Sequence, residues 1–276
     1  MKPFSWFLTA APLRRALTLI LVLAFGAFLL MPLWTLLLWA VSERWTFPGL
    51  IPQQFGTRWW QWTFDNGDIG KAAYWSLTTA PTVTLLSAVV CLPAAYAFAR
   101  FNFPFKRFFY VALLASNAFP RIGLYIAIAA FFFKLNLVGT FWGVVLAQLI
   151  NTLVTMTWIP AAAFMAVPRE LEEAARDVGA SPLRVFLSVT MPIAMPGILV
   201  ALILTFLGSL DESQATLVIG TPEITTLPVL MYTLVSSYPE PVGAVFSVLL
   251  AAPSIVLLIV VRKYLLAGYL AAGFKG

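Results

Sequence analysis

Long runs of apolar residues alternate with short polar segments along the whole chain. Six of these runs are about as long as the helix of roughly 20 residues that crosses a bilayer. They cover residues 16–41, 76–99, 108–133, 141–167, 192–211 and 243–261. The pattern predicts an all-α integral membrane protein with six transmembrane helices, in one membrane domain of residues 16–261.

The first apolar run could be mistaken for a cleaved signal peptide. It is longer than a signal h-region of about 7–15 residues, and no A-x-A cleavage site follows it. We therefore expect a retained span, preceded by a short N-terminal tail of residues 1–15.

The composition supports a membrane protein and argues against an enzyme. Of 276 residues, 61% are hydrophobic and 10% are charged, whereas a soluble domain has about 25% charged residues. The chain has no histidine, so the acid–base and metal chemistry of imidazole is absent. Its single cysteine, Cys91, lies inside a predicted span and forms no disulfide framework. We expect no catalytic residues, no metal site and no cofactor bound by this chain.

The basic residues predict the orientation of the spans. With the N-terminus in the cytoplasm, the 17 Lys and Arg residues divide into twelve inside, four outside and Arg121 within a span, as the positive-inside rule requires. Those inside are Lys2, Arg14, Arg15, Arg100, Lys106, Arg107, Arg169, Arg176, Arg184, Arg262, Lys263 and Lys275, and those outside are Arg44, Arg58, Lys71 and Lys134. Both termini are then cytoplasmic, and residues 262–276 form a C-terminal tail. Membrane spans explain the net charge of +6 without a nucleic-acid partner.

Tryptophans gather in the first outer segment, residues 42–75. Tryptophan is typical of the membrane–water interface, and Pro48-Gly49 and Asn66-Gly67 predict turns. We expect a short surface helix and interface anchoring here, with a sugar-stacking site as the alternative.

Strongly polar residues inside spans are costly and mark candidate functional positions. In the fourth run, four of them follow the spacing i, i+3, i+4 and i+7 of one helical face: Gln148, Asn151, Thr152 and Thr155. Such a face either lines a solute pathway or forms hydrogen bonds with a neighbouring helix. The sequence leaves both interpretations open.

Two further polar positions are candidates for the solute pathway. Pro120-Arg121 interrupts the third run near its middle, and Asn117 and Arg121 lie one turn apart beside Pro120. Arg121 could contact a solute, pair with an acid or extend to the interface. Asp211 and Glu212, with Gln214, close the fifth run. They are either solvated at its outer mouth or placed within the bundle, where they would contact a cation, a hydroxylated solute or Arg121.

The most charged segment of the chain, residues 168–192, lies between the fourth and fifth runs. Pro168 suits a first helical turn, and three glutamates follow it where the helix dipole favours negative charge. Gly179 is expected to end this helix in a left-handed conformation. Ser181 and Pro182 then predict a second helix, as its N-cap and first residue. The segment is therefore expected to form a cytoplasmic elbow of two helices joined at a glycine.

Within this elbow, Glu173-Ala174-Ala175 is followed after three residues by Gly179, and after nine more by Val189-Thr-Met-Pro192. This spacing resembles the EAA motif of permease subunits in binding-protein-dependent ABC importers, which is Glu-Ala-Ala, three residues, Gly, nine residues and Ile-x-Leu-Pro. Val189 and Met191 stand where the motif has Ile and Leu.

The resemblance extends over most of the chain. Residues 267–276 and 136–142 resemble the second permease of maltose-type importers. Residues 172–181, in contrast, lack the Ile-Asp-Gly common in the sugar branch, and residues 209–212 followed by 226–228 resemble the polyamine-type second permease. A carbohydrate or polyol is the favoured solute, with a polyamine or related small solute as the alternative.

This resemblance implies a type I ABC importer permease fold in which the elbow is the coupling helix that binds a groove of the ATPase subunit. The residues that match this role are Glu173, Ala174, Ala175, Arg176, Asp177, Gly179 and Pro192, and Lys275 and Gly276 of the tail would reach towards the same subunit. The sequence has no P-loop of the form G-x-x-x-x-G-K-[ST]. ATP and Mg²⁺ are therefore expected on a partner ATPase dimer.

The resemblance also implies the other partners and the location. They are a homologous second permease, a periplasmic or lipid-anchored solute-binding protein and membrane lipid, in the bacterial inner membrane. The implied mechanism is alternating access, driven by ATP binding and hydrolysis on the partner. A passive channel is the alternative from another class, but it leaves the elbow unexplained.

Overall fold

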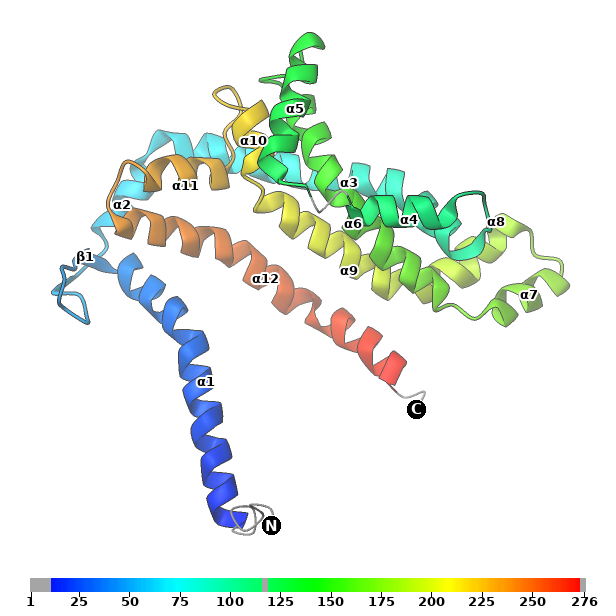
Figure 1. Cartoon of the computed structure of the whole chain (residues 1–276), viewed down its shortest axis with the longest axis horizontal. Helices are drawn as coiled ribbons and strands as arrows, with labels where there is room; N and C mark the ends of the chain where they lie inside the picture. Colours follow the sequence, from blue (N-terminus) through cyan, green and yellow to red (C-terminus); the bar gives the residue numbers. More distant parts are fainter. Residues whose placement is uncertain (1–10, 116–118, 274–276) are drawn as a thin grey trace, which may run out of the picture. The chain divides into compact units, whose positions relative to one another are not determined.

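The computed structural model describes the backbone of residues 11–115 and 119–273, and the side chains of residues 15–115 and 119–259. Its elements follow in chain order (Figure 1): α1 (Ala11–Ala40), β1 (Ser42–Arg44), β2 (Gln54–Phe55), α2 (Arg58–Asp65), α3 (Gly67–Arg100), α4 (Lys106–Ala115), α5 (Arg121–Lys134), α6 (Phe141–Met165), α7 (Arg169–Asp177), α8 (Pro182–Val185), the π-helix η3 (Phe186–Thr190), α9 (Met191–Leu210), α10 (Gln214–Ile219), α11 (Leu227–Val235) and α12 (Glu240–Gly273). Over these described residues the fold is helical apart from one very short hairpin.

That hairpin is a small correction to the all-α prediction. β1 and β2 pair antiparallel, with Ser42 opposite Phe55. Gly49 N–H donates to the carbonyl of Thr46 at 3.0 Å in the turn between them. Because the turn at Pro48-Gly49 returns the chain on itself, two short strands meet where the sequence predicted only turns.

Among the described residues, five helices are long and apolar enough to cross a membrane. They are Arg15–Ala40, Gly67–Arg100, Phe141–Met165, Pro182–Leu210 and Glu240–Ile259. These correspond to the first, second, fourth, fifth and sixth predicted spans. The last of these helices belongs to α12, which continues to Gly273 and so through most of the predicted C-terminal tail.

The predicted third span, residues 108–133, differs from the others. It is divided between α4 and α5, which lie on either side of residues 116–118. Pro120 precedes α5 with an extended ψ of 116°, and proline also disfavours the helical conformation in the residue before it. Two shorter helices therefore make up the third run, and Pro120 lies in the break between them, where the sequence predicted an interruption.

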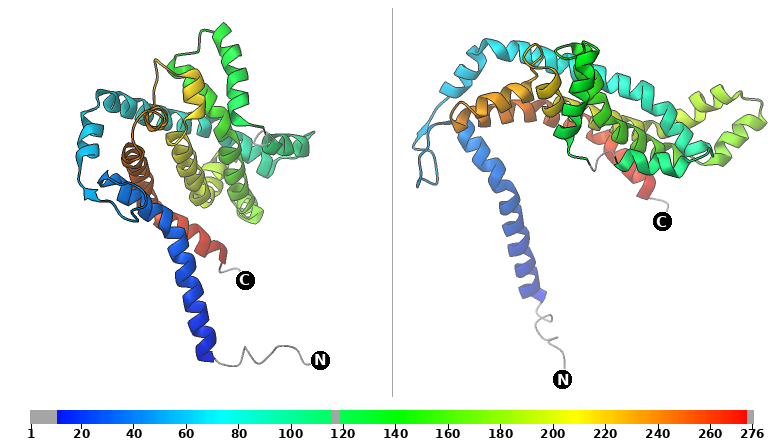
Figure 2. Two further views of the ribbon diagram at one scale, coloured as in Figure 1. Left: turned by 60° about the vertical axis from the view of Figure 1, so that its left-hand side comes forward. Right: turned by 45° about the horizontal axis from the view of Figure 1, so that its top comes forward.

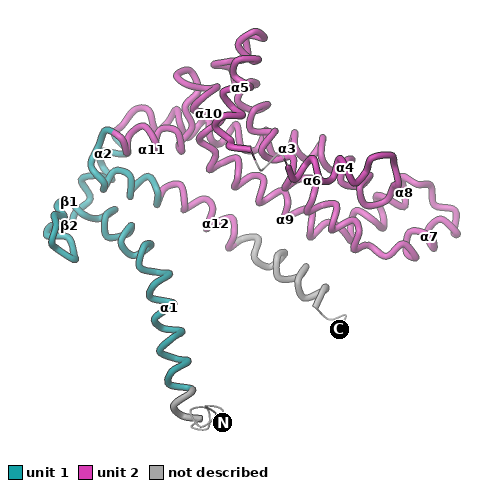
Figure 3. The backbone as a smooth tube through the Cα atoms, viewed as in Figure 1, with its two compact units in different colours: residues 1–65, 237–248 teal, residues 66–236, 249–276 magenta. Residues whose placement is uncertain are grey.

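The chain divides into two compact units (Figure 3), residues 1–65 with 237–248 and residues 66–236 with 249–276. In the smaller unit, tryptophans hold the first outer segment together. The indole N–H of Trp60 donates to the carbonyl of Ala40 at 2.6 Å, and that of Trp45 donates to Gly49 at 2.7 Å. These two hydrogen bonds fix both indoles to backbone carbonyls of the smaller unit.

In the larger unit, α3, α6 and α9 pack against one another and form the core (Figure 2). Many of the buried contact positions carry small residues, including Ala95 and Ala99 on α3, Ala161 on α6 and Ala194 on α9. Small residues let membrane helices approach closely, because little side chain separates the backbones.

Two groups of shorter helices lie at opposite ends of α6 (Figures 1 and 2). At its first turns, α5 and α10 pack through a cluster that includes Tyr125, Phe132, Ala147 and Ile219. At its other end the chain forms α7 and α8, which lead through η3 directly into α9. The elbow thus lies at one end of the bundle, and α5 with α10 lies at the other.

Candidate coupling helix and solute cavity

The elbow forms the helix that its residues predict. Glu170 and Glu172 stand in the first turn of α7 and Arg176 in the last, so the charges complement the helix dipole. Gly179 has a φ of +88°, as expected of a glycine that ends a helix. Its N–H donates to the carbonyl of Arg176 at 2.8 Å, and Ala180 N–H donates to Ala175 at 3.1 Å. These two bonds form a Schellman motif, which satisfies carbonyls that the helix end would otherwise leave unpaired.

The second half of the elbow also begins as predicted but extends further. The hydroxyl of Ser181 accepts from Arg184 N–H at 3.4 Å, and Pro182 is the first residue of α8. The helical run then continues without a break from Pro182 to Leu210. The fifth span was expected to start near Pro192, and α9 begins at Met191, but no helix boundary separates it from α8. Pro192 has no N–H to donate to the preceding turn, and the π-helical turn Phe186–Thr190 lies directly before α9.

The residues that match the EAA motif lie at the surface of this chain. Glu173, Ala174, Arg176, Asp177, Gly179 and Pro192 are exposed, and Ala175 is half-buried. Val178, between them, is 86% exposed. Apart from its two chain neighbours, no described residue lies within 4 Å of the position that a Cβ on Gly179 would take. α7 therefore presents its motif residues away from the rest of the larger unit.

One residue of α7 faces the opposite way, and sequence reasoning gave it no role. Glu172 is buried, and its Oε1 accepts from Arg100 Nη2 at 2.9 Å, Arg100 Nε at 3.1 Å and the hydroxyl of Thr190 at 2.6 Å. Arg100 Nη2 also donates to the carbonyl of Val167 at 2.9 Å. Glu172 was used only as a favourable first-turn acid, and no local pattern indicates a partner 72 positions away.

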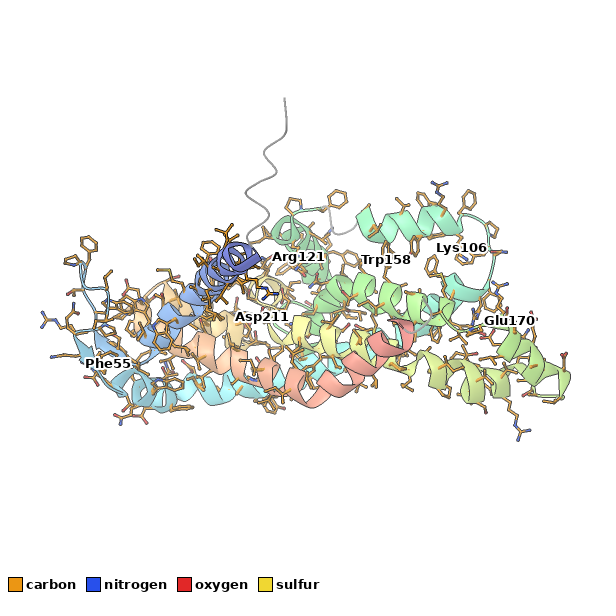
Figure 4. The ribbon with its side chains drawn as sticks, turned by 90° about the horizontal axis from the view of Figure 1, so that it is seen from below. Phe55, Lys106, Arg121, Trp158, Glu170 and Asp211 are labelled. Carbon is orange, nitrogen blue, oxygen red and sulfur yellow. The ribbon has the colours of Figure 1, made fainter. Side chains whose placement is uncertain are left out.

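At the other end of the bundle, predicted pathway residues line one polar cavity. Its volume is about 330 Å³, and it is lined by Arg121, Asn151, Thr155, Gly208, Asp211, Glu212, Ser213 and Gln214. Figure 4 shows Arg121 of α5 and Asp211, which follows α9, close to each other, with Glu170 of α7 at the far end of the same unit. Three separate stretches of sequence that carried intramembrane polar residues therefore meet at one site.

The polar face of α6 divides between the two interpretations that the sequence left open. Gln148 is buried; it donates to the hydroxyl of Thr216 at 3.0 Å and accepts from the hydroxyl of Ser209. Thr152 is also buried and forms a hydrogen bond with Ser87 of α3. These two residues join helices, whereas Asn151 and Thr155 line the cavity.

The two adjacent acids also differ from each other. Glu212 is buried, and its carboxylate accepts from Ala215 N–H at 2.7 Å and from the N–H and hydroxyl of Thr216, both at 3.3 Å. It thereby satisfies free N–H groups in the first turn of α10. Asp211 is exposed. Among the described residues, no ion pair joins Arg121 to either acid.

Three predicted positions lie outside the described residues: Asn117, Lys275 and Gly276. Gln214, predicted beside Asp211 and Glu212 at the end of the fifth run, lines the cavity with them. Gly208 and Ser213 also line it although they were not among the predicted pathway residues. The position of Ser213 directly after Asp211-Glu212 is the signal that would have found it.

Residues 90–272 match the family described as binding-protein-dependent transport system inner membrane component. This chain belongs to that family. It is a permease subunit of a binding-protein-dependent ABC importer, a transport component that spans the inner membrane several times. Membership implies an ATPase and a binding protein as partners, and it decides against the passive channel.

Two relatives cover similar shares of the chain. The trehalose transport system permease protein SugB of Mycobacterium tuberculosis is 30% identical over 226 residues, which are 78% of this chain and 82% of that protein. The sulfoquinovosyl glycerol transport system permease protein SmoH of Agrobacterium fabrum is 28% identical over 204 residues, 73% of this chain and 72% of that protein.

A solved structure shares the fold over nearly the whole length. It is a chain from the crystal structure of a bacterial ABC transporter involved in the import of the acidic polysaccharide alginate. The TM-score is 0.73 and the identity 17%, over 95% of this chain and 99% of that chain. Together with the family match, this likeness shows the type I ABC importer permease fold.

Proposed function

We propose that the cavity beside Arg121 and Asp211 is part of the pathway by which this permease imports a carbohydrate or polyol. The observation that carries the proposal is the convergence of an amide, hydroxyls, a carboxylate and a guanidinium on one cavity of about 330 Å³ within a membrane protein. Polar groups at such positions are costly unless they serve a purpose. Their mixture of donors and acceptors suits a solute that carries many hydroxyl groups.

The cavity favours a hydroxylated solute over a polyamine for an electrostatic reason. A polyamine needs several acids that are free to pair with it. The carboxylate of Glu212 already accepts three hydrogen bonds from the start of α10, which leaves Asp211 as the freer acid. Arg121 in the same lining would repel a polycation. Both relatives described above carry names of hydroxylated solutes, trehalose and sulfoquinovosyl glycerol, which supports the same class.

We further propose that α7 is the coupling helix and that its exposed motif residues bind a groove of an ATPase subunit. In this arrangement ATP and Mg²⁺ lie on an ATPase dimer, and the pathway is completed by a homologous second permease. A solute-binding protein delivers solute at the end of the bundle that carries α5 and α10. The orientation inferred from the basic residues supports this placement, because α3 and α6 end, and α9 begins, at the predicted cytoplasmic elbow.

The six-span topology with both termini inside belongs to the same proposal, with α4 and α5 together in the position of the third span. Residues 1–15 and 262–276 would then be cytoplasmic tails around a transmembrane domain of residues 16–261, with lipid surrounding that domain. Rigid-body movement of α7 would be transmitted to the bundle. The cavity would then open alternately to the outside and to the cytoplasm.

The test is the ATPase activity and solute uptake of the reconstituted complex with its binding protein, against sugars, polyols and polyamines. Stimulation by one sugar or polyol supports the proposal. Stimulation by a polyamine alone would replace the solute class. An ATPase activity that neither the binding protein nor any of the solutes stimulates would refute the assignment of the pathway.

A further inference from the structure

The only ion pair within the described residues is buried in the protein, at the first turn of the coupling helix α7. The Nη2 of Arg100 and the Oε1 of Glu172 are 2.9 Å apart, with side chains that are 8% and 5% exposed. Thr190, which is fully buried, donates its hydroxyl to the same carboxylate oxygen at 2.6 Å. A second nitrogen contact and the bond from Arg100 to the Val167 carbonyl complete the cluster.

These contacts join three elements that are far apart in the sequence. Arg100 is the last residue of α3, Glu172 lies in the first turn of α7, and Thr190 is the last residue of the π-helix η3 that opens the span of α9. Single π-helical turns inside α-helices occur frequently at functional sites. The Val167 carbonyl belongs to the link between α6 and α7. The guanidinium of Arg100 therefore also fixes the backbone segment that leads into the coupling helix.

The two sides of α7 carry residues with different roles. Its neighbour Glu173 is exposed and begins the EAA motif, whereas Glu172 is buried against the bundle. α7 therefore carries motif residues on an exposed side and one charged anchor on the covered side. A buried carboxylate is tolerated because the guanidinium and the hydroxyl pair with it, and an unpaired one would be strongly unfavourable.

We propose that Arg100, Glu172 and Thr190 form a clamp that fixes α7 to α3 and to the start of α9, so that movement of the coupling helix turns the bundle as a rigid body. The three are positioning residues, because none of them touches solute or nucleotide. The proposal rests on the proposed role of α7 as coupling helix. The clamp adds a route by which movement of α7 is transmitted to the bundle. This route is the charged contact to α3, in addition to the covalent connections of α7 to α6 and α8.

The decisive variant is Glu172→Gln, which keeps the size of the side chain and an acceptor for Thr190 but removes the charge that pairs with Arg100. In the reconstituted importer we expect the number of solute molecules imported per ATP hydrolysed to fall. Changes in coupling energy at such positions correspond to roughly 2- to 30-fold effects. Binding of the ATPase subunit should persist, because the exposed motif residues are unchanged.

The matched control is Glu170→Gln, the same substitution half a turn earlier on α7, at an exposed acid outside the EAA motif. It should leave the ratio of solute to ATP unchanged. Thr190→Val and Arg100→Lys provide milder variants, since each removes only part of the cluster. Because Arg100 and Glu172 act through each other, the double variant Arg100→Gln/Glu172→Gln should lose about as much coupling as Glu172→Gln alone.

The outcomes separate this inference from the function it rests on. A normal solute-to-ATP ratio for Glu172→Gln, while Gly179→Asp abolishes transport, would overturn the clamp and leave the coupling helix intact. If Glu172→Gln does not accumulate, while Thr190→Val and Arg100→Lys accumulate and couple normally, the cluster serves folding and the clamp is refuted. Normal transport by Gly179→Asp would instead refute the coupling helix itself.

Discussion

Gly197 of α9 lies so close to Ala163 of α6 that a Cβ added to the glycine would stand 2.5 Å from the Ala163 Cβ. No flexible side chain is available to move aside, because the neighbouring atom is fixed to the α6 backbone. The contact therefore sets the distance between α6 and α9, the helices that contribute Asn151, Thr155 and Gly208 to the proposed pathway.

We expect Gly197→Val to destabilise the membrane domain by about 1–3 kcal/mol, as overpacking of a tight contact does. The measurement is thermal unfolding of the purified permease complex. Gly208→Ala is the control, because outside its own helical turn no described residue lies within 4 Å of a Cβ at that position. Equal stability of the two variants would show that α6 and α9 separate freely.

Gly179→Asp is expected to abolish transport while membrane insertion remains normal. The structure supplies the backbone reason: a φ of +88° is strained for residues with a side chain, by about 1–3 kcal/mol. Uptake and the amount of protein in the membrane are measured together. Gly179→Asn is the matched variant: asparagine and aspartate tolerate the left-handed conformation alike, so the two variants differ only in charge, and the asparagine variant should retain part of the activity. Normal uptake by the aspartate variant would remove the coupling assignment.

Gln148→Leu and Asn151→Leu should have different effects although the residues are three positions apart on one helix. Replacing Gln148 removes the acceptor of the buried Ser209 hydroxyl and one of the two partners of the Thr216 hydroxyl, which costs about 1–3 kcal/mol of stability. Asn151 lines the cavity, so its replacement should instead reduce solute uptake, by roughly two- to tenfold for one lost hydrogen bond. Thermal unfolding and uptake of both variants decide the matter, and a loss of stability in Asn151→Leu alone would reverse the two roles.

The adjacent acids provide a second pair of matched substitutions. Glu212→Gln weakens the hydrogen bonds to the N–H groups of Ala215 and Thr216, and bonds to charged acceptors contribute about 1.5–3 kcal/mol. We expect it to lower thermal stability. Asp211→Asn should leave stability unchanged and raise the solute concentration needed for half-maximal uptake, because Asp211 is exposed beside Arg121 in the cavity lining. The same unfolding temperature for Glu212→Gln and wild type would contradict the capping role.

Several features could be predicted because they depend on neighbours along the chain. The lengths of the apolar runs predict the helices that correspond to five of the six proposed spans. The ends of α7 follow from its first-turn acids and from Gly179, whose conformation is a local requirement. The EAA spacing predicted the family that the match to residues 90–272 shows.

Local reasoning about prolines was only partly sufficient. Apolar content alone does not divide residues 108–133, but Pro120 does, because proline disfavours the helical conformation in the residue before it. Pro192 begins no separate helix, since the helical run continues from Pro182 through the π-helical turn before it.

The sequence by itself determined the elements, the family and the residue types from which a polar site can be built, because periodicity, capping and motif spacing act within a few turns. Only the tertiary structure decided how those residues are used. It directs Gln148 and Thr152 to neighbouring helices, and Asn151 and Thr155 to a cavity shared with Arg121 and Asp211. It also pairs Arg100 with Glu172, 72 positions apart. Such choices depend on which helix faces lie against each other, and that is set by packing between distant segments.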